Sequence, residues 1–241
     1  MAKQLREYQS NALTAINGAL SKGEKKMLLV LGTGLGKTFT AVQASMQFQK
    51  KLWITHEEGL LEQSGTAFLR ELYPNLSIEQ MIATYGGLSD YLKAIRKNPL
   101  FGDSSDNELL NNVGIIKAEA FDINADIILA SAQTLHRRLD KIQPNRFDMI
   151  VADEAHLFGS KTFVKSLNYF DPKLLLGLTA TPLRNDGAML ADIFDSIVYQ
   201  YSMGDGIRDG YLCELDALRI KSNISLDNVK TLGGEFNQKE L

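Results

Sequence analysis

Residues 31–38, with the sequence LGTGLGKT, constrain the fold more than any other segment of the chain. An apolar run at 27–31 leads into this segment, and a helical pattern follows it from Lys37 to Phe48. Glycines between a strand and a helix let backbone N–H groups turn inward around phosphate oxygens, and the helix adds its positive N-terminus. The segment therefore predicts an α/β domain that binds a nucleotide phosphate at this turn.

Each residue of this loop has an expected task. Lys37 would reach the β- and γ-phosphates, and the Thr38 hydroxyl would bind Mg²⁺. The rest of the loop would surround the nucleotide of ATP–Mg²⁺ with backbone N–H groups: Gly32, Thr33, Gly34, Leu35 and Gly36. The strict phosphate-loop pattern has a glycine where this chain has Leu31, although G-x-G-K-T is intact. A glycine-rich turn without a ligand remains the alternative.

The composition excludes some classes of protein. The chain has 241 residues, of which 44% are hydrophobic, so it can form a large domain with a core. Its formal net charge is -3, so any contact with nucleic acid must be local. No apolar run reaches the ~20 residues of a membrane span, and the N-terminus lacks a signal-peptide core. With a single cysteine, Cys213, these features favour a soluble, cytoplasmic (intracellular) protein.

Apolar runs alternate with helical patterns along the chain, and a further helix is expected at 59–72. Beyond the first run, strands are expected at 52–55, 113–117, 127–130, 149–152 and 174–179. Continuous apolar strands between helices are typical of a mostly parallel sheet with helices on both faces. A polar stretch at 98–112 is expected to be a surface loop. We assign residues 1–221 to one nucleotide-binding domain and the polar tail at 222–241 to a linker.

The predicted strand at 149–152 runs into two carboxylates, Asp153 and Glu154. Carboxylates at the end of a buried strand are costly unless a cation lies beside them, and in a phosphate-loop protein that cation is Mg²⁺. Asp153 would hold the metal, and Glu154 would orient and deprotonate the attacking water. An acidic helix cap with two ordinary surface carboxylates is the alternative.

The phosphate loop and the sequence Asp-Glu-Ala-His at 153–156 together resemble the signature of superfamily 2 helicases and translocases. Further segments that resemble motifs of this family follow in its order: LREYQ at 5–9 (adenine recognition), 53–63 (motif Ia), 126–135 (motif Ib) and LTATP at 178–182 (motif III). Residues 181–187 and 207–212 are similar to the branch that contains type III restriction motor subunits and related DNA-repair helicases. The resemblance covers residues 3–215, and motifs IV to VI are missing.

This resemblance implies roles for residues outside the phosphate loop. Gln9, with Arg6 nearby, would recognise the adenine base, although both could simply begin a helix. His156, Thr179 and Thr181 would couple hydrolysis to strand movement, although the threonines could simply favour a strand end.

Nucleic acid is expected to meet short polar side chains of motifs Ia and Ib. The candidates are Thr55, Gln63 and Thr134. Contacts of this kind go to phosphates and carry no sequence information.

The fold that the resemblance implies is the RecA-like phosphate-loop domain, and the activity is that of an ATPase motor acting on DNA. A second RecA-like domain, in the same or another chain, would supply an arginine finger, so the isolated chain is expected to be weakly active. Two alternatives remain open. One is an RNA helicase, which the segment at 181–187 disfavours, and the other is a nucleotide-dependent binding module without turnover.

Overall fold

The computed structural model describes residues 4–56, 58–72, 84–97, 112–159, 161–181, 190, 193–216, 231–232 and 235–236. The expected loop at 98–112 lies almost wholly outside these ranges, as do residues 182–187 of the restriction-like segment. In the part of the chain that the structure describes, no helix is long and apolar enough to cross a membrane.

An eight-stranded sheet organises the molecule, with the strand order β4-β3-β5-β2-β6-β7-β1-β8. Its strands are β1 (Lys26–Leu31), β2 (Lys51–Thr55), β3 (Val113–Lys117), β4 (Ala120–Phe121), β5 (Ile127–Ser131), β6 (Met149–Ala152), β7 (Leu174–Thr179) and β8 (Ser196–Tyr201). All neighbouring strands pair in parallel except β3 and β4, which are antiparallel. The parallel strands therefore end at one edge of the sheet, the carboxyl edge, and begin at the opposite edge, the amino edge.

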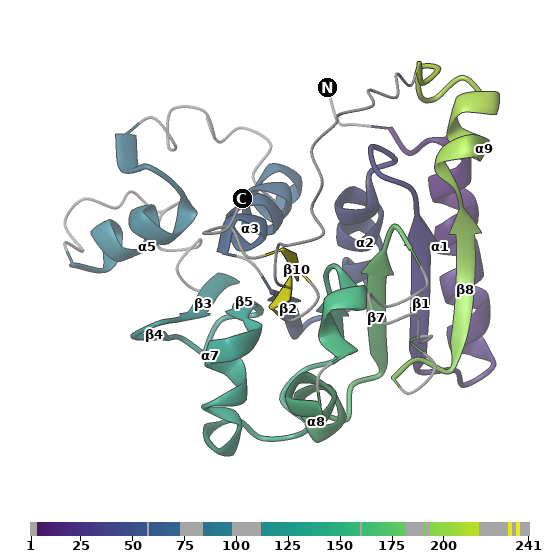
Figure 1. Cartoon of the computed structure of the whole chain (residues 1–241). Coiled ribbons are helices and arrows are strands. Elements are labelled where there is room, and N and C mark those ends of the chain that lie inside the picture. The colour runs from purple at the N-terminus through teal and green to yellow at the C-terminus, as the bar shows by residue number, and fades with distance from the viewer. Residues whose placement is uncertain are drawn as a thin grey trace.

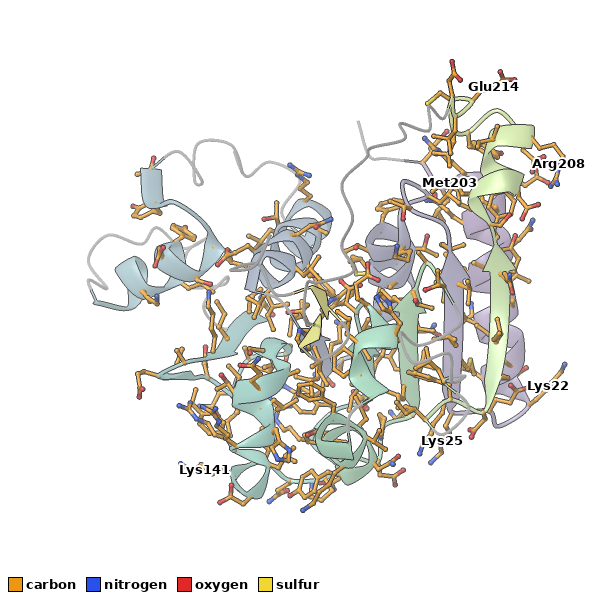
Figure 2. The ribbon with its side chains drawn as sticks, viewed as in Figure 1. Lys22, Lys25, Lys141, Met203, Arg208 and Glu214 are labelled. Carbon is orange, nitrogen blue, oxygen red and sulfur yellow. The ribbon has the colours of Figure 1, made fainter. Side chains whose placement is uncertain are left out.

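Helices cover both faces of this sheet, which confirms the expected fold class. The helical elements are α1 (Glu7–Ser21), α2 (Lys37–Ser45), α3 (Glu58–Leu72), α5 (Leu88–Lys97), α7 (Ala132–His136), η2 (Leu139–Lys141), η3 (Ala155–Gly159), α8 (Lys161–Tyr169) and α9 (Met203–Arg208). Figure 1 shows α1 beside β8 at one end of the sheet, and α5 near β3 and β4 at the other. In Figure 2, Met203 and Arg208 lie toward the carboxyl edge, whereas Lys22 and Lys25 lie toward the amino edge.

The core consists of two clusters because successive strand residues point to opposite faces. Leu29 and Trp53 belong to the cluster that includes residues of α1, α2, α3 and α5. Leu28 and Ile54 belong to the cluster that includes residues of α7 and α8. Both clusters contain residues of β1 and β2, so the middle of the sheet is buried on both faces and holds its carboxyl edge rigidly.

Several elements were not expected from the sequence, among them α5, α8, β4, β8 and a pair of strands in the tail. The half-exposed edge strand β8 has no continuous apolar run, because only one long side of it is paired. Within the segment assigned to a linker, β9 (Thr231–Leu232) pairs antiparallel with β10 (Glu235–Phe236). The sequence between them is Gly233-Gly234, a composition that suits a linker and is also typical of hairpin connections.

Candidate nucleotide and metal site

The phosphate loop turns between β1 and α2 as the sequence predicts. Gly34 and Gly36 have φ angles of 82° and 74°, in the left-handed region that glycine tolerates. A Cβ atom on Gly36 would lie 2.8 Å from Gln9 Nε2, and one on Gly32 would lie 2.6 Å from the backbone nitrogen of Met203. Leu31, at the position of the strict pattern's first glycine, is instead the last buried residue of β1.

Lys37 and Thr38 form the first turn of α2, behind Gly36 at the N-cap. Both are partly exposed, as are Thr33 and Gly34, so this part of the loop is accessible to a ligand. The Leu35 side chain is fully buried, which leaves only its backbone for a nucleotide.

Gln9 is fixed against the phosphate loop. Its Oε1 accepts the Arg6 backbone N–H at 3.0 Å, and its Nε2 donates to the Leu35 carbonyl at 3.2 Å. The Tyr8 hydroxyl donates to the same carbonyl at 2.9 Å. An amide has two N–H donors and two acceptor lone pairs, so Gln9 retains one N–H and one lone pair for a further partner.

Three tyrosines and Arg6 surround this end of the loop. The ring of Tyr8 stacks on Tyr201 with centroids 4.5 Å apart, and Tyr211 approaches Tyr8 edge-on at 5.0 Å. The Arg6 guanidinium lies 5.4 Å from the Tyr211 ring centroid. The aromatic partners of Tyr8 have no local signal in the sequence, because they come from β8 and the segment after α9, far along the chain.

Asp153 and Glu154 lie at the carboxyl end of β6, opposite the phosphate loop's lysine. Lys37 Nζ is 3.7 Å from Glu154 Oε1. Glu154 has a φ of 52°, a left-handed conformation that is uncommon for a residue with a side chain and often marks a functional position.

Asp153 is 3% exposed. Burial raises the pKa of its carboxyl, and the neighbouring Glu154 carboxylate raises it further. Three donors partly offset this cost. The Glu154 backbone N–H donates to Oδ1 at 3.1 Å, and Trp53 Nε1 and Ser64 Oγ each lie 3.4 Å from Oδ2.

The three residues expected to couple hydrolysis to movement lie in one chain of contacts. His156 Nδ1 is 3.4 Å from Glu154 Oε2 and 3.2 Å from Thr179 Oγ1. The Thr179 hydroxyl in turn donates to the Thr181 carbonyl at 2.7 Å. A polar path therefore runs from Lys37 through Glu154 and His156 to the end of β7.

The donor set suits a magnesium–nucleotide complex. The Asp153 carboxylate and the Thr38 hydroxyl offer oxygen ligands, which Mg²⁺ prefers. The raised pKa of Asp153 marks a buried negative charge that a cation would stabilise. Across the described ranges, no three His, Cys, Asp or Glu side chains converge to hold a metal unaided. Mg²⁺ needs no such cage where substrate phosphates supply the remaining ligands.

The candidate nucleic-acid residues are not brought together in this way. Thr55 is 1% exposed, because β2 is an interior strand, so its side chain is not presented to solvent. Gln63 is exposed on α3. Thr134 is half-buried, and its hydroxyl accepts the Ala118 backbone N–H at 3.2 Å.

Comparison with known proteins identifies the family. Residues 2–184 match the family described as "Type III restriction enzyme, res subunit". This chain belongs to that family. The resemblance to superfamily 2 helicases and translocases is thereby confirmed.

Two curated relatives cover nearly the whole chain. The putative ATP-dependent helicase IRC3 of Saccharomyces cerevisiae is 27% identical over 252 residues, which cover 98% of this chain and 32% of the relative. The endonuclease subunit of the type I restriction enzyme EcoAI of Escherichia coli is 27% identical over 242 residues, which cover 97% of this chain and 26% of the relative. This chain therefore spans about a third or less of these relatives.

Solved structures share the fold. The fragment of a putative HsdR subunit of a type I restriction enzyme from Vibrio vulnificus aligns with a TM-score of 0.55 and 23% identity, covering 85% of this chain and 32% of that one. The Sulfolobus solfataricus SWI2/SNF2 ATPase core, in complex with dsDNA, aligns with a TM-score of 0.52 and 20% identity, covering 80% and 35%. These likenesses show that the domain has the RecA-like fold.

Proposed function

We propose that this chain is the ATP-hydrolysing motor domain of a DNA translocase or helicase that works with Mg²⁺ and a second RecA-like domain. The observation that carries the proposal is the contact path Lys37–Glu154–His156–Thr179. It joins the phosphate loop, the acidic strand end and the end of β7. A glycine-rich turn without a ligand, or two ordinary surface carboxylates, would not require these contacts. The path therefore favours an enzyme that hydrolyses ATP over a module that only binds it.

In this proposal the residues divide the work of phosphoryl transfer. Bound Mg²⁺–ATP would supply the transferred phosphoryl group and an electrophilic metal centre. Lys37 and the loop N–H groups would bind the phosphates, and Thr38 and Asp153 would hold the metal. Glu154 would accept a proton from the attacking water. When Glu154 gains a proton or moves, its contact with His156 would change, and the contacts of His156 with Thr179 and of Thr179 with Thr181 would change in turn.

The Gln9 amide supports a preference for adenine. Its remaining N–H and lone pair match the N7 acceptor and the amino donor of adenine, whereas guanine presents a carbonyl in place of that amino group. Two hydrogen bonds already hold the amide in place, so adenine would meet a preorganised partner.

DNA is the proposed nucleic acid because similar proteins include subunits of type I restriction enzymes and an ATPase core in complex with dsDNA. Gln63 and the Thr134 region are the proposed contacts in this domain.

The second RecA-like domain is proposed because an arginine finger adds about 10³–10⁵-fold in rate to related phosphoryl transfers. Arg208 is a poor candidate for this finger, because it already pairs with Asp205 at 2.7 Å and Asp209 at 3.2 Å.

Steady-state ATPase assays test the proposal. The chain alone should turn over slowly, and a longer form that includes the second domain should be stimulated by DNA but not by RNA. Lys37→Ala in the longer form should remove the stimulated rate. Stimulation by RNA alone would favour the RNA helicase alternative. Turnover of the chain alone at about 1–100 s⁻¹, as in complete phosphoryl-transfer enzymes, would contradict the need for a second domain.

A further inference from the structure

We propose that Trp53 and Ser64 are positioning residues that orient the Asp153 carboxylate for Mg²⁺ and connect it to the segment expected to contact DNA. This inference rests on the proposed function of Asp153 as a metal ligand. Trp53 lies on β2 and Ser64 on α3, within or next to motif Ia. Neither residue belongs to the phosphate loop or to the Asp-Glu-Ala-His segment.

Both side chains contact the same carboxylate oxygen. Trp53 Nε1 and Ser64 Oγ each donate to Asp153 Oδ2 over 3.4 Å, and both residues are 1% exposed. The Glu154 backbone N–H donates to the other oxygen, Oδ1, at 3.1 Å. A carboxylate has about four acceptor positions, so these donors occupy both positions of Oδ2 and one of Oδ1. The position that remains, on Oδ1, is the one available to a metal or a metal-bound water.

The indole of Trp53 is fixed well enough to perform this task. Phe68 packs edge-on against it with ring centroids 5.2 Å apart, and Leu52 and Ile54 on either side are buried. A buried indole N–H normally needs an acceptor, and Asp153 Oδ2 is the acceptor here. The residue therefore contributes both core packing and a directed donor, and these contributions can be separated by substitution.

Helix α3 carries the second donor beside two other contacts. Glu62 accepts the Leu88 backbone N–H at 2.8 Å and so joins α3 to α5. Gln63, the proposed DNA contact, is exposed, and the next residue, Ser64, contacts Asp153. A Cβ atom on Gly65 would meet the side chains of Leu88 and Leu129 at 2.2 and 2.6 Å, so α3 packs closely at this point. A shift of α3 on binding DNA would thus alter a hydrogen bond to the metal carboxylate.

This connection differs from the path through His156 and Thr179. That path begins at Glu154, which is proposed to activate water, and leads to β7. The contacts of Trp53 and Ser64 end on the other carboxylate and lead to β2 and α3. The arrangement predicts that substitution of Trp53 or Ser64 raises the Mg²⁺ concentration that nucleotide binding requires. The affinity for nucleotide without Mg²⁺ should not change.

The test uses Trp53→Phe, which keeps an aromatic ring but removes the donor, and Ser64→Ala. Ser166→Ala is the matched control, because Ser166 on α8 is also a buried serine, but its Oγ lies 3.0 Å from Nδ1 of His136 on α7. Binding of a fluorescent ADP analogue to the purified chain is measured in EDTA and across a Mg²⁺ titration. Circular dichroism melting verifies that each variant is folded.

We expect the Mg²⁺ concentration for half-maximal enhancement of ADP binding to rise about 10-fold in each variant, the lower end of the effect of residues that orient metal ligands. The ADP affinity in EDTA should stay at the wild-type value, and Ser166→Ala should match wild type in both conditions. Wild-type Mg²⁺ dependence in folded Ser64→Ala and Trp53→Phe would overturn the inference. If Trp53→Phe fails to fold, Ser64→Ala decides alone.

The same experiment separates this inference from the function on which it rests. If wild-type protein binds the analogue without any dependence on Mg²⁺, the proposed metal site is wrong and the inference fails with it. If wild-type binding depends on Mg²⁺ but the variants are unchanged, only the positioning role is wrong.

Discussion

Strand β6 has an aspartate next to each end, and the two are in opposite electrostatic situations. Asp148, at the amino edge, accepts the Lys50 backbone N–H at 2.9 Å and pairs with Lys173 Nζ at 2.9 Å. The Lys50 N–H first, and then Lys173, lower the pKa of its carboxyl. At the carboxyl edge, burial and the adjacent Glu154 raise the pKa of Asp153.

The amino edge holds groups that stabilise the fold, whereas the carboxyl edge holds the groups proposed to act on a ligand. At the amino edge, carboxylates meet cations and backbone donors, as in the pairs Lys25–Asp171 and Lys50–Asp126. At the carboxyl edge, two carboxylates are adjacent, and Lys37 Nζ lies 3.7 Å from one of them, at Glu154 Oε1. Groups with perturbed pKa values cluster at functional sites, because the protein tolerates there a cost that a ligand relieves.

Among substitutions at the carboxyl edge, Glu154→Gln should lower turnover the most. The amide keeps the shape of the carboxylate but cannot accept the proton, so turnover should fall about 10²–10⁴-fold, the usual contribution of a general base. Affinity for Mg²⁺–ATP should change little. Single-turnover hydrolysis and equilibrium binding, measured in the two-domain form, verify both statements. Hydrolysis at the wild-type rate would remove Glu154 from the mechanism.

Lys37→Ala should weaken nucleotide binding without unfolding the chain. Hydrogen bonds from a charged donor are worth about 1.5–3 kcal/mol, so the affinity for ATP should fall roughly 10–100-fold. Lys173→Ala is the matched control, since it removes a lysine from a carboxylate at the opposite edge. Isothermal titration calorimetry should show a loss of affinity for the first variant alone, and equal affinities in both variants would contradict the assignment.

The contrast between the two edges also explains what could be predicted from the sequence. Lys37 was predicted from the glycine-rich turn between an apolar run and a helix, and Asp153 and Glu154 were predicted because two carboxylates at the end of a buried strand call for a cation. His156 and Thr179 required the family resemblance, and the structure brings them within 3.2 Å of each other. Their roles in catalysis and coupling stay predictions.

Other features have no local signal in the sequence. Trp53 belongs to the apolar run that predicted a strand at 52–55, and it is buried, but its N–H contact with Asp153 depends on a side chain 100 positions away. Ser64 has no special neighbours along the chain. Thr55 was predicted to contact nucleic acid as a short polar residue of motif Ia, but the strands beside β2 leave its side chain 1% exposed. Contacts across a sheet are set by strand order, which the sequence pattern leaves open.

Gln9→Ala tests whether the site at the carboxyl edge also recognises the base of the nucleotide. Loss of a pair of hydrogen bonds to a base edge costs about 1–3 kcal/mol in discrimination, so the preference for ATP over GTP should fall roughly 10-fold or more. The ratio of the two affinities is the proper measure, because Gln9 also supports the Leu35 carbonyl and its loss could weaken both nucleotides. An unchanged ratio would show that the base is read elsewhere.

The two aspartates should respond oppositely to the same substitution. Asp148→Asn weakens charge-assisted contacts with Lys50 and Lys173, so the free energy of unfolding should fall by about 1 kcal/mol. Asp153→Asn removes a buried charge, so the melting temperature without Mg²⁺ or nucleotide should rise. Urea denaturation and thermal melting in EDTA measure both signs. A loss of stability in both variants would show that Asp153 is as well satisfied as Asp148.

The changes in stability caused by Asp148→Asn and Asp153→Asn should depend on pH in different ways. This pH dependence should be the smallest of the predicted effects. Asp148 has a folded pKa below its unfolded value of about 3.9, so its stabilising contribution is complete above that value and is lost as the pH falls through the folded pKa. Asp153 has a folded pKa above its unfolded value, so its ionised form destabilises the protein at neutral pH. That penalty disappears as the pH falls through the folded pKa toward about 3.9. Between neutral pH and about pH 4, the gain from Asp153→Asn should therefore shrink while the loss from Asp148→Asn persists. Urea denaturation of wild type and both variants across this range, in EDTA, measures the two differences. A constant gain from Asp153→Asn down to about pH 4 would mean that the buried charge is not the cause of the difference.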